Sequence, residues 1–333
     1  MRKFIAPFLV AAAALLPLAS QAQDAIRLGY AKCAHCTPLS LTPQSADPAK
    51  VKLEASAFNT GNDVLTALLS KSIDVAQVTY LHYATALDKG FDVVAVSGQI
   101  NGGSQILVGN EVPVAENDWA GLKKVIADYK AQGKPFRVAA SRGNAQDIHM
   151  RGAFAKQGID VAKDVQFVNI PNPSDHVQAL RRGEVELICS VDPFATQIRE
   201  VKAAKFFAFP YDQAAGKLTN LIVTRSDVVA GKPRGLEETV RSIVKVNDRM
   251  EQDRTLFVDT IQKVTGLDKA VATGAAENLY PDYRMHRASA VAIAKMMKDL
   301  RYINSDVSDA VEKHLDYRFL EAATGKPKSA LGY

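Results

Sequence analysis

A pattern of eleven residues occurs twice in this chain. Residues 66–76 read TALLSKSIDVA and residues 178–188 read QALRRGEVELI. In both copies the residue types predict the end of a helix, a tight turn and a strand, and Asp74 and Glu186 occupy the same step. A repeat this short also arises by chance. If it reflects duplication, it predicts two similar α/β lobes that face each other.

Strands and helices are expected to alternate on both sides of this repeat. The first part should contain strands at 26–30, 51–58, 73–78, 93–96 and 106–108, with helices at 64–70 and 80–89. The second part should contain helices at 122–130, 144–157 and 174–182, with strands at 136–140, 165–170, 185–189 and 206–209. From Leu236 onward the chain should be mostly helical, including 236–249 and 288–300. The alternation predicts a largely parallel sheet flanked by helices.

The N-terminus has the pattern of a secretory signal peptide. Arg2 and Lys3 precede an apolar run over 8–18, and small side chains at Ser20 and Ala22 suit a signal peptidase. The run is shorter than the roughly 20 residues that a membrane-spanning helix needs. We therefore expect residues 1–22 to be removed after Ala22, leaving a soluble protein in the periplasm.

The remaining chain of about 310 residues is long enough for two domains. Loss of Arg2 and Lys3 lowers the formal net charge from +5 to +3, since residues 1–22 contain no acid. The basic residues are scattered and form no long run, so a nucleic-acid partner is not expected.

Several segments together resemble one known family. They are residues 26–30 followed by Pro38-Leu39, residues 58–61 leading into 67–76, residues 86–96, 138–143, 158–160 and 179–185. Their order and spacing are similar to those of the nitrate/sulfonate/taurine group of ABC-importer substrate-binding proteins. The resemblance covers most of residues 26–210 and only the general character of the helical tail.

This resemblance implies the two-lobed periplasmic binding protein type II fold. Each lobe would be a helix-flanked mixed sheet, with lobe one at 24–105 and 222–333 and lobe two at 108–218. Residues 103–109 and 218–224 would be the two crossover strands, and a small molecule would be enclosed between the lobes by hinge closure. The expected partner is the membrane permease of an ABC importer, and the protein would be a monomer without cofactors. A related branch with this fold makes a thiamine pyrimidine precursor, but its cysteine-rich segment is absent here, so an enzyme is not expected.

The resemblance places the ligand loops after the carboxyl ends of the strands, where open α/β sheets bind ligands. The lobe-one candidates are Thr37, Asn59, Thr60, Thr79, Tyr80 and Ser104, and the lobe-two candidates are Ser141, Arg142, Gly143, Asn144 and Asp192. Helix N-termini favour anions, and Thr37 before Pro38 has the pattern of a helix N-cap. Arg142 would bind an oxyanion and Asp192 an ammonium group, which suits an anionic or zwitterionic molecule such as an aminosulfonate. The alternative for each residue is ordinary helix capping or turn chemistry.

The first ligand loop departs from the family pattern because it contains Cys33-Ala34-His35-Cys36. A disulfide between the two cysteines is one interpretation, because the periplasm is oxidising. A second is a site for a soft metal ion or a metal complex, with Cys189 as a further ligand from lobe two. Thioredoxin-type redox chemistry is a third, although its βαβ context is missing. We count Cys33, His35 and Cys36 among the candidate ligand-binding residues.

Overall fold

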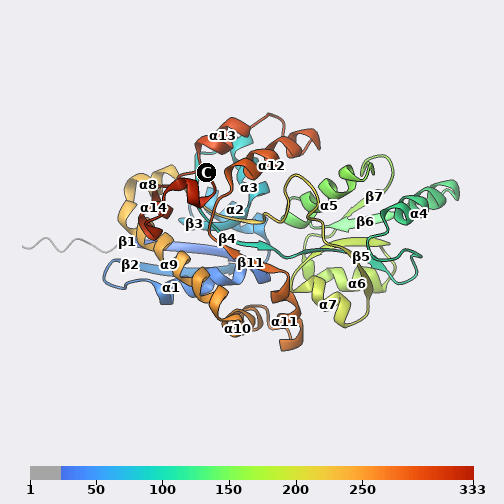
Figure 1. Ribbon diagram of the computed structural model, residues 1–333, viewed down its shortest axis with the longest axis horizontal. Coiled ribbons are helices and arrows are strands. Elements are labelled where there is room, and N and C mark those ends of the chain that lie inside the picture. The colour runs from blue at the N-terminus through green and yellow to red at the C-terminus, as the bar shows by residue number, and fades with distance from the viewer. Residues whose placement is uncertain (1–23) are drawn as a thin grey trace, which may run out of the picture.

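The computed structural model describes residues 24–333, and the predicted signal peptide lies outside the described residues. Two lobes lie side by side in Figure 1. One contains both the N-terminal strands and the C-terminal helices, and the other contains the middle of the chain. No helix within 24–333 is long and apolar enough to cross a membrane.

A six-stranded mixed sheet forms the core of lobe one. Its order is β11-β4-β10-β3-β1-β2. The strands are β1 (Asp24–Ala31), β2 (Val51–Phe58), β3 (Val75–Thr79), β4 (Val93–Gly102), β10 (Asn220–Arg225) and β11 (Leu279–Asp282). Strand β1 is parallel to β2 and β3, whereas β10 runs antiparallel to both of its neighbours.

Lobe two has a five-stranded sheet of the same design, in the order β7-β6-β8-β5-β9. Its strands are β5 (Ser104–Gly109), β6 (Arg137–Ala140), β7 (Gln166–Asn169), β8 (Leu187–Val191) and β9 (Ala204–Ala208). Strand β5 is antiparallel to β8 and β9, just as β10 is antiparallel to β3 and β4. Each lobe therefore receives one antiparallel strand between the strands of its own α/β unit.

The chain changes lobes at Gly103, because β4 pairs in the first sheet and β5 in the second. Gly102 and Gly103 have φ values of 89° and 87°, which favour glycine. A Cβ on Gly102 would lie 2.3 Å from the carbonyl oxygen of Asn278. The chain returns to the first sheet between β9 and β10. The division of the lobes at 105, 108, 218 and 222 stays a prediction.

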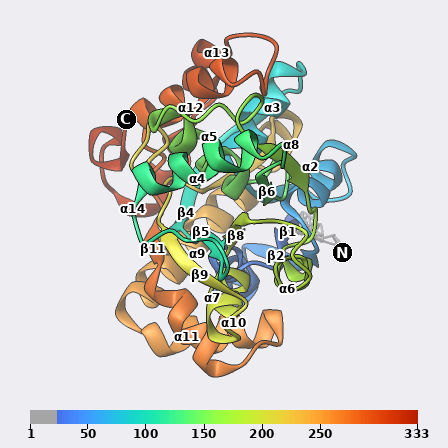
Figure 2. The ribbon, with the colours of Figure 1, turned by 90° about the vertical axis from the view of Figure 1, so that its right-hand side faces the viewer.

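Helices cover both sheets (Figure 2). They are α1 (Thr42–Ser45), α2 (Gly61–Leu69), α3 (Tyr80–Asp88), α4 (Trp119–Ala131), α5 (Ala145–Lys156), α6 (His176–Arg181), α7 (Phe194–Glu200), α8 (Ser226–Gly231), α9 (Pro233–Gln252), α10 (Arg254–Thr265), α11 (Lys269–Glu277), α12 (Arg287–Asp299), α13 (Ser308–Lys313) and α14 (Arg318–Thr324). The described part of the chain also contains three 3-10 helices: η1 (Ala34–Leu41), η2 (Pro173–Asp175) and η3 (Lys328–Leu331). Helix α9 packs against β1, β2, β4 and β11, and α5 packs against β5, β6 and β8.

Most predicted elements are present, with ends shifted by a few residues. The largely parallel sheet predicted from periodicity alone was wrong for three strands, because β10, β11 and β5 run antiparallel to their neighbours and make both sheets mixed. The predicted helix start at Thr37 and Pro38 was also wrong. Helix η1 starts at Ala34 after an extended Cys33, and Thr37 lies inside it with its hydroxyl bonded to the carbonyl of Ala34.

The two copies of the sequence repeat have the same structure in both lobes. In lobe one the side chain of Arg27 bonds to Asp74 and to the carbonyl of Lys71. In lobe two Arg137 bonds in the same way to Glu186 and to the carbonyl of Gly183. The shared acid of the repeat thus anchors the first strand of each α/β unit.

Asp74 is the more buried of the two acids, with a side chain 4 % exposed, and Arg225 and Lys232 also lie within 4 Å of it. Burial raises its pKa, but the hydrogen bonds from Arg27 and the charges of Lys232 and Arg27 outweigh burial, so the pKa is lowered. A carboxyl group of this kind stabilises the fold above its unfolded-state pKa, and the contribution is lost as pH falls through the folded-state pKa.

We predict that Asp74→Asn lowers the free energy of unfolding at pH 7 by roughly 2–3 kcal/mol, because Arg27, Arg225 and Lys232 lose their buried carboxylate partner. Urea denaturation measures the change, and the difference from wild type should shrink below about pH 4. Glu116→Gln, at an exposed acid, is the control and should change stability by less than about 0.5 kcal/mol. Equal effects of the two substitutions would contradict the prediction.

Candidate ligand cavity between the lobes

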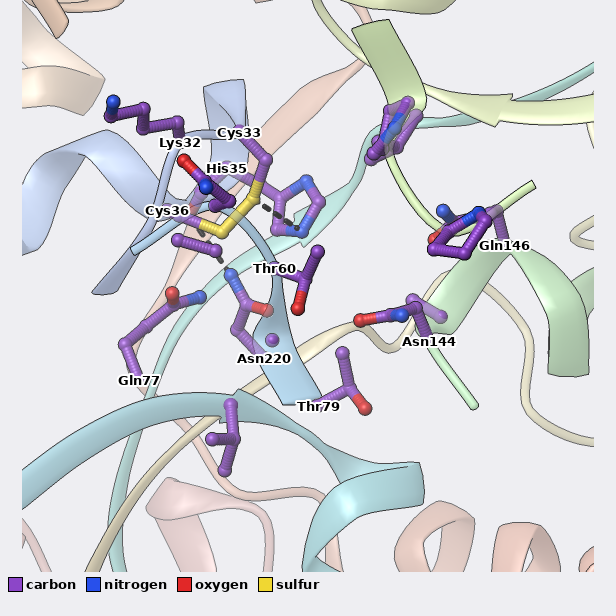
Figure 3. A pocket seen from close by; sticks show the side chains of 18 residues that line it. Lys32, Cys33, His35, Cys36, Thr60, Gln77, Thr79, Asn144, Gln146 and Asn220 are labelled. Carbon is purple, nitrogen blue, oxygen red and sulfur yellow. Dashed lines mark hydrogen bonds between the residues drawn. A yellow bond between two sulfur atoms is a disulfide. The ribbon is translucent and has the colours of Figure 1, made fainter. Parts of the chain in front are cut away.

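A small cavity lies between the two lobes, at the carboxyl ends of β1, β3 and β8 (Figure 3). Its volume is about 40 Å³. Lobe one contributes Ala31, Lys32, Cys33, His35, Cys36, Asn59, Thr60, Gly61, Gln77, Val78, Thr79 and Asn220, and lobe two contributes Asn144, Ala145, Gln146, Pro171, Pro173 and Val191.

Three helices begin at the cavity wall. Thr60 caps α2 by accepting a hydrogen bond from the backbone N–H of Asp63, and Thr79 caps α3 in the same way. Asn144 is the N-cap residue of α5, but its side chain makes no capping hydrogen bond. The first-turn N–H groups of a helix have no partner within the helix, and the dipole makes this end positive. The predicted loops at 59–60, 79 and 144 therefore bring positive helix ends to the cavity.

Buried amides form another part of the wall. Gln77 lies on β3 and Asn220 lies at the start of β10, and each residue is 1 % exposed. Asn220 Nδ2 donates to the carbonyl oxygen of His35 at 2.9 Å. Within residues 24–333, Asn220 Oδ1 has no hydrogen-bond partner, and neither Nε2 nor Oε1 of Gln77 has one.

The cysteine loop faces the same cavity. Cys33 and Cys36 form a disulfide, and His35 Nε2 lies 3.1 Å from Cys33 Sγ. Burial, with a smaller effect from the charge of His149, lowers the pKa of His35 to about 3, so the ring is neutral at ordinary pH. One potential ligand atom from each of Cys33, His35 and Cys36 lies within 4.8 Å of the others.

Cys189 does not join this group. It lies on β8, fully buried among the apolar side chains of lobe two, and burial raises the pKa of its thiol well above the usual value. The described residues therefore bring together three of the four predicted metal ligands.

Several other predicted residues lie beside the cavity but do not line it. Tyr80 is buried and donates to the carbonyl of Met285, and Thr37 is inside η1. Ser104 bonds to His149, and Ser141 lies 3.4 Å from His176. The residues concerned are Thr37, Tyr80, Ser104, Ser141, Arg142, Gly143 and Asp192.

Arg142 and Asp192, the two charged candidates, have other surroundings. Arg142 is exposed, with its guanidinium 4.9 Å from the centre of the Phe167 ring. Asp192 is fully buried and accepts hydrogen bonds from Gln105, Thr196 and Asn278. Burial raises the pKa of Asp192 above its usual value, although these hydrogen bonds act to lower it.

Gln77, Gln146 and Asn220 line the cavity but were not among the predicted residues, and neither were Lys32, Pro171 and Pro173. One feature of the sequence could have indicated Gln77, because it is a polar residue in the middle of the strand VAQVT. No such feature indicated Asn220, because its position follows only from the pairing of β10 with Thr79 on β3.

The lobes also contact each other outside the cavity. Ala34 N donates to Asp192 O at 2.8 Å, and Asn62 Nδ2 donates to Arg142 O at 3.3 Å. At the far side of α5, the hydroxyl of Tyr302 donates to Asp147, and Arg151 Nε bonds to both. Since Asp147 and Arg151 belong to lobe two and Tyr302 to lobe one, we call these three residues the interlobe contact.

A family model described as the NMT1-like family matches residues 19–261. The chain belongs to the NMT1-like family. The match includes every residue that lines the cavity, since these residues all lie between Ala31 and Asn220. A comparison of the sequence with curated proteins found no match.

Solved structures show the same fold. A ligand-binding component of an ABC-type import system from Staphylococcus aureus, solved with zinc bound, is 18 % identical with a TM-score of 0.76, over 91 % of this chain and 100 % of that one. The alkanesulfonate-binding protein from Xanthomonas axonopodis pv. citri bound to MOPS is 18 % identical with a TM-score of 0.70, over 86 % and 96 %. A periplasmic nitrate-binding protein from Synechocystis is 14 % identical with a TM-score of 0.77, over 93 % and 91 %. The fold is therefore that of the periplasmic binding proteins of ABC importers.

Proposed function

We propose that this protein is the periplasmic receptor of an ABC importer and binds a small anionic or zwitterionic organic molecule between its lobes. The observation that carries the proposal is that three helices, from both lobes, begin at the wall of the cavity. The nitrate- and sulfonate-binding proteins of the same fold support it. The receptor would act as a monomer, pass its cargo to a membrane permease, and catalyse no reaction.

The charges around the cavity favour an anion over a cation. Among the described residues that line it, none is acidic and Lys32 is the one lysine or arginine. The Lys32 side chain is exposed and points away from the centre of the cavity (Figure 3). An anionic group would thus be held by helix N–H groups and neutral side chains, as helix N-termini allow. A sulfonate such as taurine fits this chemistry, with Arg142 and Asp192 as predicted outer contributors.

Closure would follow from rotation of the lobes about the two connections between the sheets. The described form is closed, because a Cβ on Gly61 would lie 2.9 Å from Asn144 Oδ1 across the cleft. A ligand that contacts both lobes binds the closed form better and shifts the population toward it.

A second candidate function is a receptor for a soft metal ion or metal complex. It is favoured by the close approach of Cys33, His35 and Cys36 beside the cavity. Two thiolates and an imidazole suit Zn²⁺ or Cu⁺. This function needs reduced cysteines, since the disulfide occupies both sulfur atoms.

We predict that small anions stabilise the protein after it has been unfolded and refolded to remove bound cargo. Nitrate, methanesulfonate, acetate and taurine are compared with chloride in a thermal-shift assay. A ligand at a hundredfold excess over its Kd adds about 2.7 kcal/mol to the stability of the folded state. If none of these compounds raises the melting temperature, the anion receptor is refuted.

Two variants locate the site in the same assay. Asn144→Ala removes a polar side chain from the cavity wall and should weaken binding by about tenfold, because a bound group loses its partner. Arg142 lies two residues before Asn144 and does not line the cavity. If the Arg142→Ala variant binds with unchanged affinity, Arg142 is not part of the ligand site. Equal loss in both variants would instead support the predicted role of Arg142.

We predict that Tyr302→Phe weakens ligand binding by about tenfold without altering the cavity, because the closed form loses hydrogen bonds to Asp147 and Arg151. The loss should appear mainly as faster dissociation in stopped-flow measurements. Tyr129→Phe is the control, since Tyr129 packs on Phe136 within lobe two. Unchanged dissociation in Tyr302→Phe would show that the interlobe contact does not stabilise closure.

For the metal receptor, we predict that the reduced protein binds about one equivalent of Zn²⁺ and that Cys36→Ser loses it. Competition with a coloured chelator and elemental analysis measure the metal. Cys189→Ser is the matched control and should keep the metal, because Cys189 lies in the core of lobe two. Negligible metal in both the reduced wild type and Cys36→Ser would refute this function.

A further inference from the structure

Two buried amides at the cavity constrain the chemistry of the cargo. Gln77 and Asn220 lie on neighbouring antiparallel strands, with Gln77 opposite Ile222 and Asn220 opposite Thr79. The side chains of two directly opposite residues point to the same face of a sheet. Gln77 and Thr79 also share a face, because they are two residues apart on one strand. Gln77 and Asn220 are therefore diagonal neighbours on the face that lines the cavity (Figure 3).

The orientation of the Asn220 amide follows from its backbone contact. Because a carbonyl oxygen accepts but cannot donate, the atom that bonds to His35 O must be Nδ2. Asn220 Oδ1 is then left as an acceptor, and it has no partner. Gln77 offers a second acceptor and a donor, and both of its side-chain atoms also lack partners.

Buried polar atoms without partners are costly, and a bound molecule can satisfy them. Other amides of the described residues also lack partners, including Gln99 on β4. Gln77 and Asn220 differ from Gln99 because they line the cavity. Their atoms form a set of two acceptors and one donor that a cargo must complement.

We infer that the cargo carries a neutral, amide-type N–H group that donates to Gln77 Oε1 and Asn220 Oδ1, with Gln77 Nε2 donating to an oxygen beside it. A carboxylate or sulfonate at this position would face Asn220 Oδ1 without a proton to donate. An ammonium group would be desolvated with no carboxylate on the cavity wall, which is unfavourable. An amide supplies donor and acceptor together without a charge.

This inference rests on the proposed receptor function and assigns the second end of the cargo. Helix N-termini would bind the anionic end, and the buried amides would bind the N–H end. The predicted ammonium partner, Asp192, is not required, because its carboxylate already accepts hydrogen bonds from Gln105, Thr196 and Asn278.

Three matched pairs of small probes test the inference by isothermal titration calorimetry on the full mature chain. They are sulfamate against methanesulfonate, oxamate against pyruvate, and acetamide against acetone. In each pair an NH₂ group replaces a CH₃ group of nearly the same size. We expect the NH₂ member to bind at least about tenfold more tightly in one or more pairs, because the unmatched member leaves buried acceptors unpaired.

The outcomes separate the inference from the proposed function. Preference for acetamide without binding of any anion would uphold the inference and refute the anion receptor. Anion binding with equal affinities within every pair would uphold the receptor and overturn the inference. Absence of binding by all six probes would overturn both.

Gln77→Glu provides a reversal test, because it breaks no protein hydrogen bond and adds a negative charge. The variant should shift the ratio of glycine affinity to oxamate affinity by at least about tenfold in favour of glycine, whose ammonium group now has a partner. Gln99→Glu, an equally buried glutamine outside the cavity, should leave that ratio unchanged. Equal ratios in wild type and Gln77→Glu, with both proteins folded by circular dichroism, would overturn the inference.

Discussion

The buried carboxylate of Asp192 holds together the region where the two lobes meet. The backbone N–H of Asp192 donates to the carbonyl oxygen of Gly103, where the chain changes lobes. The carbonyl oxygen of Asp192 accepts from the N–H of Ala34, at the start of the cysteine loop. Its side chain accepts from Gln105 on β5 and from Asn278 of lobe one. A carboxylate in the interior is tolerated only when its oxygens have donors. The hinge, the loop and the C-terminal region are therefore fixed to one another through a single residue.

This arrangement gives Asp192, the predicted partner of an ammonium group, surroundings that the sequence alone did not show. The sequence shows an acid just beyond a buried strand, at the edge where open sheets bind ligands. What it does not show is that donors from β5, α7 and the segment before β11 converge on the same carboxylate. Distant donors of this kind decide whether a charge faces a ligand or the interior, and their arrival depends on tertiary structure.

The elements of the fold were far easier to predict than the cavity. Strand β2 coincides with its predicted range at 51–58, and the acid of the sequence repeat pairs with an arginine in each lobe. These features depend on local periodicity and on short turns. The antiparallel strands β5 and β10 depend on the crossing of the chain between lobes, which periodicity does not reveal. Strand β11 was missed inside the helical tail, where Pro281 argues against a strand.

The cavity also suggests how binding energy could be gained with Lys32 as the one charged side chain among the described residues of its wall. Closure removes water from a ligand and strengthens each hydrogen bond that replaces it. A charged side chain would lose its own hydration in the same step, whereas helix N–H groups and amides lose much less. Fixed helix ends and oriented amides are also held in place before the ligand arrives, so less ordering is required on binding. A wall made mostly of neutral groups favours selection by hydrogen-bond pattern, because each wrong group leaves a buried partner unpaired.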